Sequence, residues 1–171
     1  MNEIAKHILS VADFGLKMRL FGGAGLSVFD LVSDVYMIVV FLGSEETRGV
    51  AHVNIACVAL SLFWQLFLAG FVNKKRSWRR IAREMLYVVS FVKPGIDAAR
   101  VAAGNENDDD LAAMDPLAEL TTSKVAEMVF ESIPAAIIQT RAFIISERRT
   151  TLALVSIIIS CCTTGFAAAT M

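Results

Sequence analysis

The sequence predicts an all-α fold: a polytopic helical membrane protein with four transmembrane helices and one re-entrant or half-inserted helical segment. Of its 171 residues, 56% are hydrophobic, and the mean hydropathy is positive. Both values exceed those of a typical soluble domain of this size. Long apolar runs account for the excess. Because a spanning segment must satisfy its own backbone hydrogen bonds, we expect these runs to be helices rather than strands.

Three apolar stretches have the length of about 20 residues that a helix needs to cross a bilayer. They cover residues 22–43, 51–72 and 150–169. A fourth stretch, residues 125–145, reaches this length only as a polar transmembrane helix, because it contains charged, amide and helix-breaking residues. These are Glu127, Glu131, Pro134, Gln139 and Arg141. We therefore expect a helical membrane domain over residues 22–171.

A basic segment directly follows the second span. Its side chains that suit contact with anionic lipid are Lys74, Lys75, Arg76, Trp78, Arg79, Arg80 and Arg83. The positive-inside rule places this segment in the cytosol, the loop with Glu45 and Glu46 outside, and the N-terminus in the cytosol. Each cation near an anionic leaflet contributes about 1 kcal/mol, and Trp78 suits an interfacial anchor. We expect anionic lipids of the cytosolic leaflet as partners, and the plasma membrane rather than an internal membrane as the location.

Residues 1–21 are predicted to form a separate interfacial segment. Ile4, Ile8, Val11 and Ala12 recur at helical spacing among polar neighbours, a pattern typical of a helix that lies on the membrane surface. A cleaved signal peptide is not expected, because the apolar run comes late and contains two aspartates.

Residues 85–104 are apolar but interrupted. The run 85–92 is too short to span a bilayer, and the Lys-Pro-Gly sequence at 93–95 is expected to break the helix. We expect a half-inserted hairpin that protein or water shields, with a local ion pair between Asp97 and Arg100. A true crossing stays open as the alternative, because it would place the two arginines before the last span in the cytosol.

Residues 105–116 are predicted to form a polar, acidic loop that acts as a solvated linker. Calcium binding is the competing interpretation. An EF-hand loop would need Gly and Glu at positions where this chain has Asp110 and Pro116, so the linker is preferred.

Two pairs of carboxylates are the most informative feature of the sequence. Asp30 and Asp34 lie four residues apart in the first span, and Glu127 and Glu131 repeat this spacing in the polar helix, so each pair shares one helix face. A charge at mid-bilayer costs about 2.5 to 3.5 kcal/mol, so these side chains must face protein, water or a cation. Lys124 is the expected cationic neighbour. The full set predicted to line a polar groove is Asp30, Asp34, Glu127, Glu131, Lys124 and Gln139.

Two interpretations of these acids stay open. In the first, Lys124, Arg100 or Arg141 pairs with them and ties the helices together. In the second, they line a groove through which ions, protons or lipid headgroups move, which is the default hypothesis for ionisable residues inside a membrane. The same residues can do both.

Two short motifs stand in a particular order along the chain. The run 30–34 reads DLVSD and the run 130–134 reads FESIP, and between them lie an apolar span, a basic loop and a broken half-helix. This order resembles the XK-related family, membrane proteins that include phospholipid scramblases. The resemblance covers residue 26 to the end and corresponds to the first half of the family's architecture. It implies half-inserted helices and a polar path for lipid headgroups, in which Asp30, Asp34 and Glu131 match acidic motif positions.

Other classes of function find little support in the sequence. An enzyme is not expected, because His7 and His52 lack metal or acid–base spacing and no nucleophile or phosphate motif occurs. We expect no cofactor, no metal and no nucleic acid, since the basic run abuts a membrane span. The alternatives to lipid movement are an ion or solute transporter half, or a structural subunit. Such a subunit would bind a partner membrane protein through the small residues Gly165 and Ala169.

Overall fold

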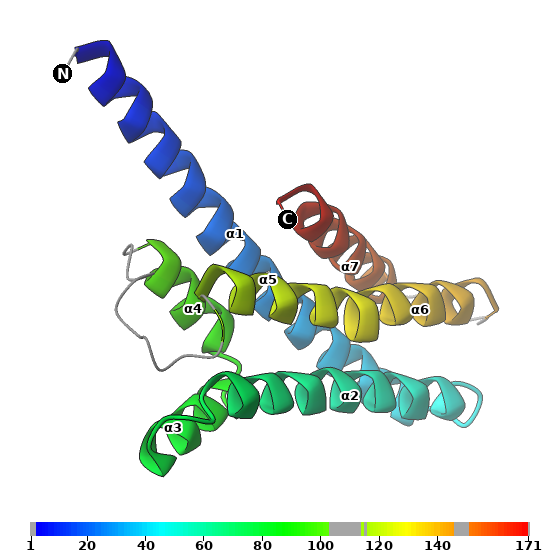
Figure 1. Ribbon diagram of the computed structural model, residues 1–171. Coiled ribbons are helices and arrows are strands. Elements are labelled where there is room, and N and C mark those ends of the chain that lie inside the picture. The colour runs from blue at the N-terminus through cyan, green and yellow to red at the C-terminus, as the bar shows by residue number, and fades with distance from the viewer. Residues whose placement is uncertain (1–2, 103–113, 115, 146–150, 171) are drawn as a thin grey trace.

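The computed structural model describes residues 3–102, 114, 116–145 and 151–170, and every regular element in these ranges is a helix. Figure 1 shows their arrangement. The elements in chain order are α1 (Glu3–Leu42), α2 (Arg48–Val72), α3 (Trp78–Val89), α4 (Lys93–Ala102), α5 (Pro116–Glu127), the π-helix η2 (Met128–Ser132), α6 (Ile133–Ile145) and α7 (Thr151–Thr170).

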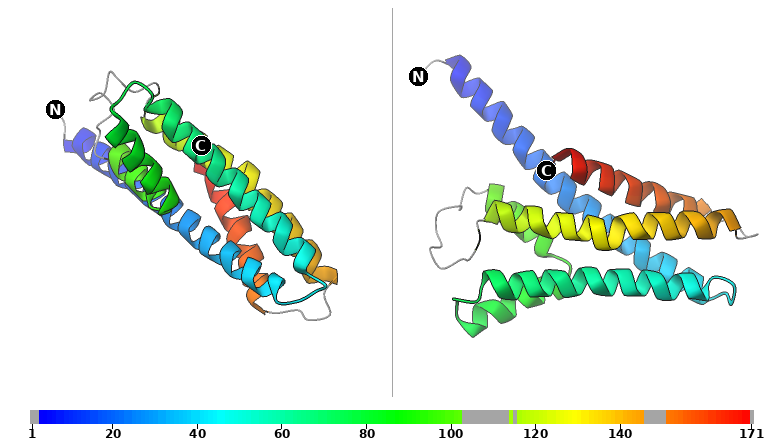
Figure 2. Two further views of the ribbon diagram at one scale, coloured as in Figure 1. Left: turned by 90° about the horizontal axis from the view of Figure 1, so that it is seen from below. Right: turned by 45° about the vertical axis from the view of Figure 1, so that its right-hand side comes forward.

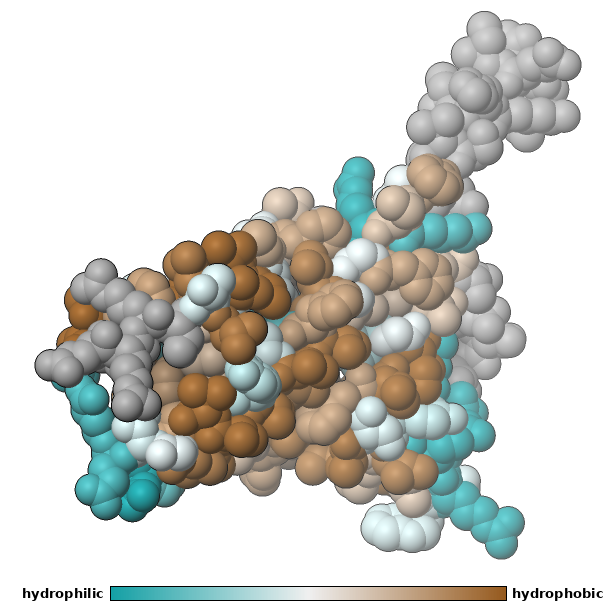
Figure 3. Space-filling view, turned by 180° about the vertical axis from the view of Figure 1, so that it is seen from behind, coloured by the Kyte–Doolittle hydropathy of each residue, from teal (hydrophilic) through white to brown (hydrophobic). Residues whose placement is uncertain are grey.

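Four of the helical segments are long and apolar enough to cross a membrane, as the sequence predicts. They are Phe14–Leu42, Arg48–Val72, Leu117–Ile145 and Thr151–Ala169. Their outward faces carry large apolar side chains such as Phe63 and Ile137, which are 66% and 64% exposed. Figure 3 shows apolar side chains covering the middle of one face, with hydrophilic groups toward its ends. Exposed apolar surface of this extent matches a lipid environment.

The first span belongs to one helix that also contains most of the predicted interfacial segment, and no break separates the two at residue 21. α1 runs unbroken from residue 3 to residue 42. The glycines at 22 and 23 do not break the helix. A Cβ on Gly22 or Gly23 would lie 3.5 or 3.4 Å from the ring of Phe166 on α7, which is an ordinary van der Waals contact. α1 and α7 therefore pack against each other in this region.

The third span is longer than the sequence predicts and contains a π-turn. It begins at Pro116 instead of residue 125, and α5, η2 and α6 follow one another without a break. Pro134 lacks an amide hydrogen, and the π-helix Met128–Ser132 directly before it changes the backbone hydrogen-bond pattern there. A proline is therefore accommodated inside a spanning helix.

The helices α3 and α4 form a hairpin at the end of the bundle where α2 ends and α5 begins (Figure 2). The chain reverses at Ser90–Val92, where Phe91 has a φ of 57°, and not at the predicted Lys-Pro-Gly sequence. Pro94 instead lies in the first turn of α4, where its missing amide hydrogen is tolerated. α3 packs against α2, and α4 packs against α1 and α5. The predicted acidic loop at 105–116 lies almost wholly outside the described residues.

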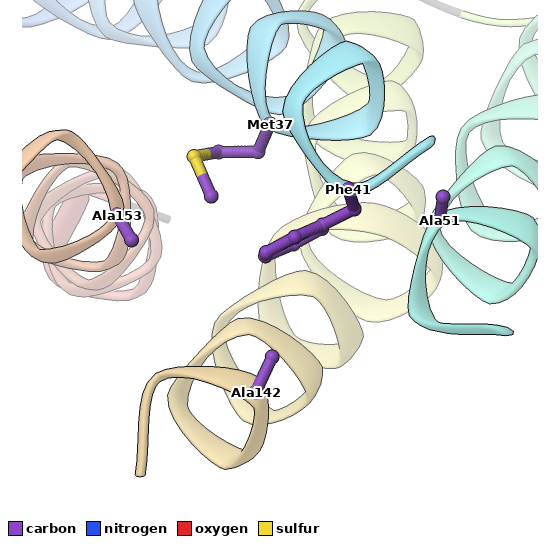
Figure 4. Packing of buried hydrophobic residues seen from close by; sticks show 5 residues of the cluster. All are labelled: Met37, Phe41, Ala51, Ala142 and Ala153. Carbon is purple, nitrogen blue, oxygen red and sulfur yellow. The ribbon is translucent and has the colours of Figure 1, made fainter. Parts of the chain in front are cut away.

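The spanning helices enclose a small apolar cluster near the connection from α1 to α2. Its buried members are Met37, Phe41, Ala51, Ala142 and Ala153. Figure 4 shows the side chains of Met37 and Phe41 projecting from α1 among the other three helices. Alanines on α2, α6 and α7 leave room for these two larger side chains, so one end of the bundle interior is closed by apolar packing.

Candidate functional site

Beyond the apolar cluster, the interior of the bundle is polar. On α1 the buried polar side chains recur every three or four residues, which places them on one helix face toward the other spans. α7 repeats this pattern with side chains of the serine and threonine type. The buried residues are Ser27, Asp30 and Asp34 on α1, and Ser156, Ser160 and Thr163 on α7. We call these residues, together with the polar groups of α2, α5, η2 and α6 that face them, the polar column.

Asp30 lies in the middle of the column and is held by two hydroxyl groups. Ser132 donates a hydrogen bond of 2.6 Å to Oδ2, and Ser160 donates one of 2.6 Å to Oδ1. The side chain is 1% exposed. Each carboxylate oxygen therefore has a donor, and these bonds tie α1 to η2 and to α7. Ser132 belongs to the FESIP motif at 130–134, whereas no sequence pattern pointed to Ser160.

Asp34 lies one turn further along α1 and is only half satisfied. Gln139 donates a hydrogen bond of 2.7 Å from Nε2 to Oδ1. Oδ2 of Asp34 and Oε1 of Gln139 have no hydrogen-bond partner among the described residues. Beside this pair, Ser33 and Ser156 share a hydrogen bond of 2.6 Å between their hydroxyls.

Lys124 takes only one of the four predicted acids as its partner. Its ammonium lies 3.3 Å from Oε2 of Glu127 and donates to the backbone oxygen of Gly23 at 3.2 Å and to the hydroxyl of Ser27. Among the described residues, no cation forms an ion pair with the other three acids of the predicted groove. In the described part of the chain, the interpretation in which Lys124, Arg100 or Arg141 pairs with these acids therefore applies to Glu127 alone.

A cavity of about 110 Å³ adjoins Lys124 between α1, α5 and α7. Its lining combines apolar side chains, including Leu20 and Phe166, with hydroxyl groups such as that of Thr121. Its charged side chains are Lys124, Arg19 and Glu127, the partner of Lys124. The cavity therefore offers charge of both signs, hydroxyls and apolar surface at one place inside the bundle.

Glu131 projects from the π-helix toward α2. It is 5% exposed, and its carboxyl group lies near the side chain of Ser61 on α2. A hollow next to it is also lined by Glu127 and by Phe91 and Pro94 of the hairpin. The tip of the hairpin therefore reaches the two glutamates. Glu127 is the last residue of α5, whereas Glu131 lies within the π-helix, so the four-residue spacing between them is not that of a regular α-helix. Both side chains are nevertheless buried.

A second charged cluster, which the sequence analysis did not identify, lies between the hairpin and α5. The Lys93 ammonium is 2.6 Å from Oε1 of Glu119, 2.9 Å from Oδ2 of Asp97 and 3.6 Å from Oε2 of Glu84. Arg100 completes the cluster at 2.5 Å from Glu84 and, as the sequence predicts, 3.1 Å from Asp97. We call these five residues the hairpin network. It contains three acids and two bases.

The charges in this network shift one another's pKa values. Burial alone would raise the pKa of Glu84, but the hydrogen bonds and charge of Arg100, with Lys93, hold it below the ordinary value. Burial alone would lower the pKa of Lys93, but Asp97 and Glu119 raise it. For Asp97, burial dominates and raises the pKa despite the neighbouring Lys93. The network therefore keeps Glu84 and Lys93 charged at neutral pH.

The basic segment divides between a turn and a helix. Lys74 and Lys75 are exposed in the turn after α2, and the Lys74 ammonium lies 4.4 Å from the centre of the Phe71 ring. The remaining members lie in this turn or on α3, with Trp78 75% exposed at its first position. Part of the predicted basic loop is thus helical. Its cations and Trp78 lie at the end of the second span.

No protein-family model, no curated protein and no solved structure matches this chain.

Proposed function

We propose that this chain is a membrane-embedded module of the XK-related type that contributes to transbilayer phospholipid movement, with its polar column as the path for lipid headgroups. The observation that carries the proposal is the contrast between the column and the apolar outer face. Acids and hydroxyls line the interior, while large apolar side chains cover the outside. A headgroup could travel inside while its acyl chains remain in the surrounding lipid.

The chemistry of the column suits a zwitterionic headgroup. Asp34 and Glu131 lack an ion pair among the described residues and could attract the amine of a headgroup, whereas Lys124 and Arg19 at the cavity could attract its phosphate. The hydroxyls of Ser27 and Thr121 offer further hydrogen bonds. A path with both signs of charge lowers the cost of moving a polar group through a bilayer.

The proposal includes a position in the membrane. The N-terminus and the basic segment lie in the cytosol of a plasma-membrane protein, and the α3–α4 hairpin enters the bilayer partway and returns on the same side. Its contacts with α1, α2 and α5 supply the protein shield that such a segment needs. The six cations of residues 74–83, with Trp78 among them, then contact anionic lipid of the inner leaflet.

The experiment measures flipping of fluorescent phospholipid in vesicles that contain the purified full chain. Asp30→Asn combined with Glu131→Gln keeps the size of both side chains but removes two charges from the column. We expect the chain to accelerate flipping and the double variant to slow it. Glu45→Gln with Glu46→Gln is the matched control, because it removes two charges from an exposed turn and should keep the original rate.

Two results would contradict the proposal. One is a flipping rate for the unchanged chain that equals the rate in protein-free vesicles. The other is a folded, inserted double variant that flips lipid at the original rate, because a headgroup path that depends on these acids would then not exist.

A further inference from the structure

Five buried polar atoms of the spanning helices lack hydrogen-bond partners among the described residues. One is Oγ1 of Thr164 on α7, and the other four belong to three side chains of α1, α2 and α6: Oδ2 of Asp34, Oε1 of Gln139, and both Oδ1 and Nδ2 of Asn54. All three side chains are at most 1% exposed. A buried polar group without a partner destabilises the fold by about 1 to 3 kcal/mol, so several such groups together require an explanation.

The three side chains lie at the same depth in the bundle. Met37, Ala51 and Ala142 belong to one contact cluster on α1, α2 and α6 (Figure 4). α2 runs antiparallel to α1 and α6. A step of three residues toward the N-terminus on α1 and α6, and toward the C-terminus on α2, therefore moves about 4.5 Å away from the cluster in the same direction on all three helices. This step leads to the three residues with unpartnered atoms. They are Asp34, Asn54 and Gln139.

The helix faces agree with this register. Ala51 and Asn54 lie on the buried face of α2, and Ser61 follows on the same face about two helical turns after Asn54. Asp34 and Gln139 are hydrogen-bonded to each other across α1 and α6. Asn54 therefore enters the interior next to a bonded pair that already has two free oxygens.

The chemistry of this layer favours a cation. Three oxygens, one from a carboxylate and two from amides, lack a donor, whereas only one amide group lacks an acceptor. No described Lys, Arg or His forms an ion pair with Asp34. Oxygen ligands of this kind suit hard cations. A single carboxylate balances one positive charge, and the described residues contain no group of three His, Cys, Asp or Glu side chains that could hold a metal ion.

We propose that Asp34, Asn54 and Gln139 form a binding site for a small monovalent cation of the sodium class. Asp34 Oδ2 supplies the charge, and the two amide oxygens complete the protein ligands. The apolar cluster closes the site on one side, and Asp30, whose two oxygens are already bonded to serine hydroxyls, bounds it on the other. This site shares Asp34 with the proposed lipid path, but its test requires no measurement of lipid movement, so the two proposals can fail separately.

The test compares thermal unfolding of the purified, detergent-solubilised chain in sodium chloride and in N-methyl-D-glucamine chloride at equal ionic strength and pH. A ligand that binds only the folded state raises Tm in a saturable manner. We therefore expect a Tm higher by several degrees in sodium, with a plateau as its concentration rises. Equal Tm values in the two salts, or a difference that follows pH instead of sodium, would overturn the proposal.

Two variants make the comparison specific. Asp34→Asn should abolish the sodium-dependent rise, whereas Asp30→Asn, the same change one turn away, should retain it. If Asp34→Asn does not fold, Asn54→Leu replaces it, because this change removes an oxygen ligand and keeps every charge. A sodium-dependent rise of unchanged size in Asp34→Asn, or in Asn54→Leu when that variant replaces it, would assign the cation to another place and overturn the proposal.

Discussion

Replacement of Lys93 by methionine tests the hairpin network. Methionine keeps the length and apolar stem of the side chain but removes the cation that lies 2.6 Å from Glu119 and 2.9 Å from Asp97. Lys93 is 2% exposed, so water cannot replace it easily. Breaking a buried ion pair by removing one partner costs about 3 to 5 kcal/mol. At about 2 to 4 °C per kcal/mol for a chain of this size, Tm should fall by roughly 6 to 20 °C.

The assay is thermal unfolding in detergent, followed by circular dichroism. Lys75→Met is the control, because this lysine is exposed and a surface change should stay within about 0.5 kcal/mol. Glu119→Gln in the Lys93→Met background should recover part of the loss, because it also removes the carboxylate that had lost its cation. Equal Tm values for Lys93→Met and Lys75→Met would refute the claim that the network stabilises the hairpin.

Three other changes test separate contacts. Ser160→Ala leaves one oxygen of Asp30 without its donor and should lower stability by about 1 to 3 kcal/mol in the same thermal assay; an unchanged Tm would contradict the hydrogen bond's role. The pKa of Glu84 lies below its ordinary value of 4.5, so this residue contributes stability above that pH that is lost as pH falls through its folded-state pKa. Glu84→Gln should therefore flatten the acid limb of the Tm profile, although Asp97, whose pKa is raised, acts in the opposite direction; an acid limb as steep as that of the unchanged chain would refute this. A soluble peptide of residues 74–83 should bind phosphatidylserine vesicles less tightly as salt increases, and salt-independent binding would speak against electrostatic attraction.

The four spans could be predicted because hydropathy and length are properties of the local sequence. The breaks between helices were harder to place. Pro94 was expected to end a helix but lies in the first turn of α4, and Phe91 has a positive φ although no glycine marks the turn. The helix also runs without a break from the predicted interfacial segment into the first span. These outcomes depend on packing between distant segments, which local patterns do not encode.

The candidate site was predictable in part. Acids inside spans identified Asp30, Asp34 and Glu131, because such residues must face the interior. Their hydrogen-bond partners could not be assigned from the sequence, since one of the two hydroxyls that bind Asp30 comes from Ser160, 130 positions away. Asn54 was visible as a polar residue inside the second span, but only its burial and its unpartnered atoms give it significance.

Thiol accessibility tests the central claim, that the polar path lies inside the bundle, most directly. Thr121 lines the cavity next to Lys124, whereas Gly165 on α7 is exposed on the outer surface with room for a side chain. Each is changed to cysteine in a chain whose native cysteines at 57, 161 and 162 are alanine, and a water-soluble thiol reagent is added to vesicles. The account predicts rapid modification of Thr121→Cys and protection of Gly165→Cys by lipid. Protection of both, or faster modification of Gly165→Cys, would contradict it.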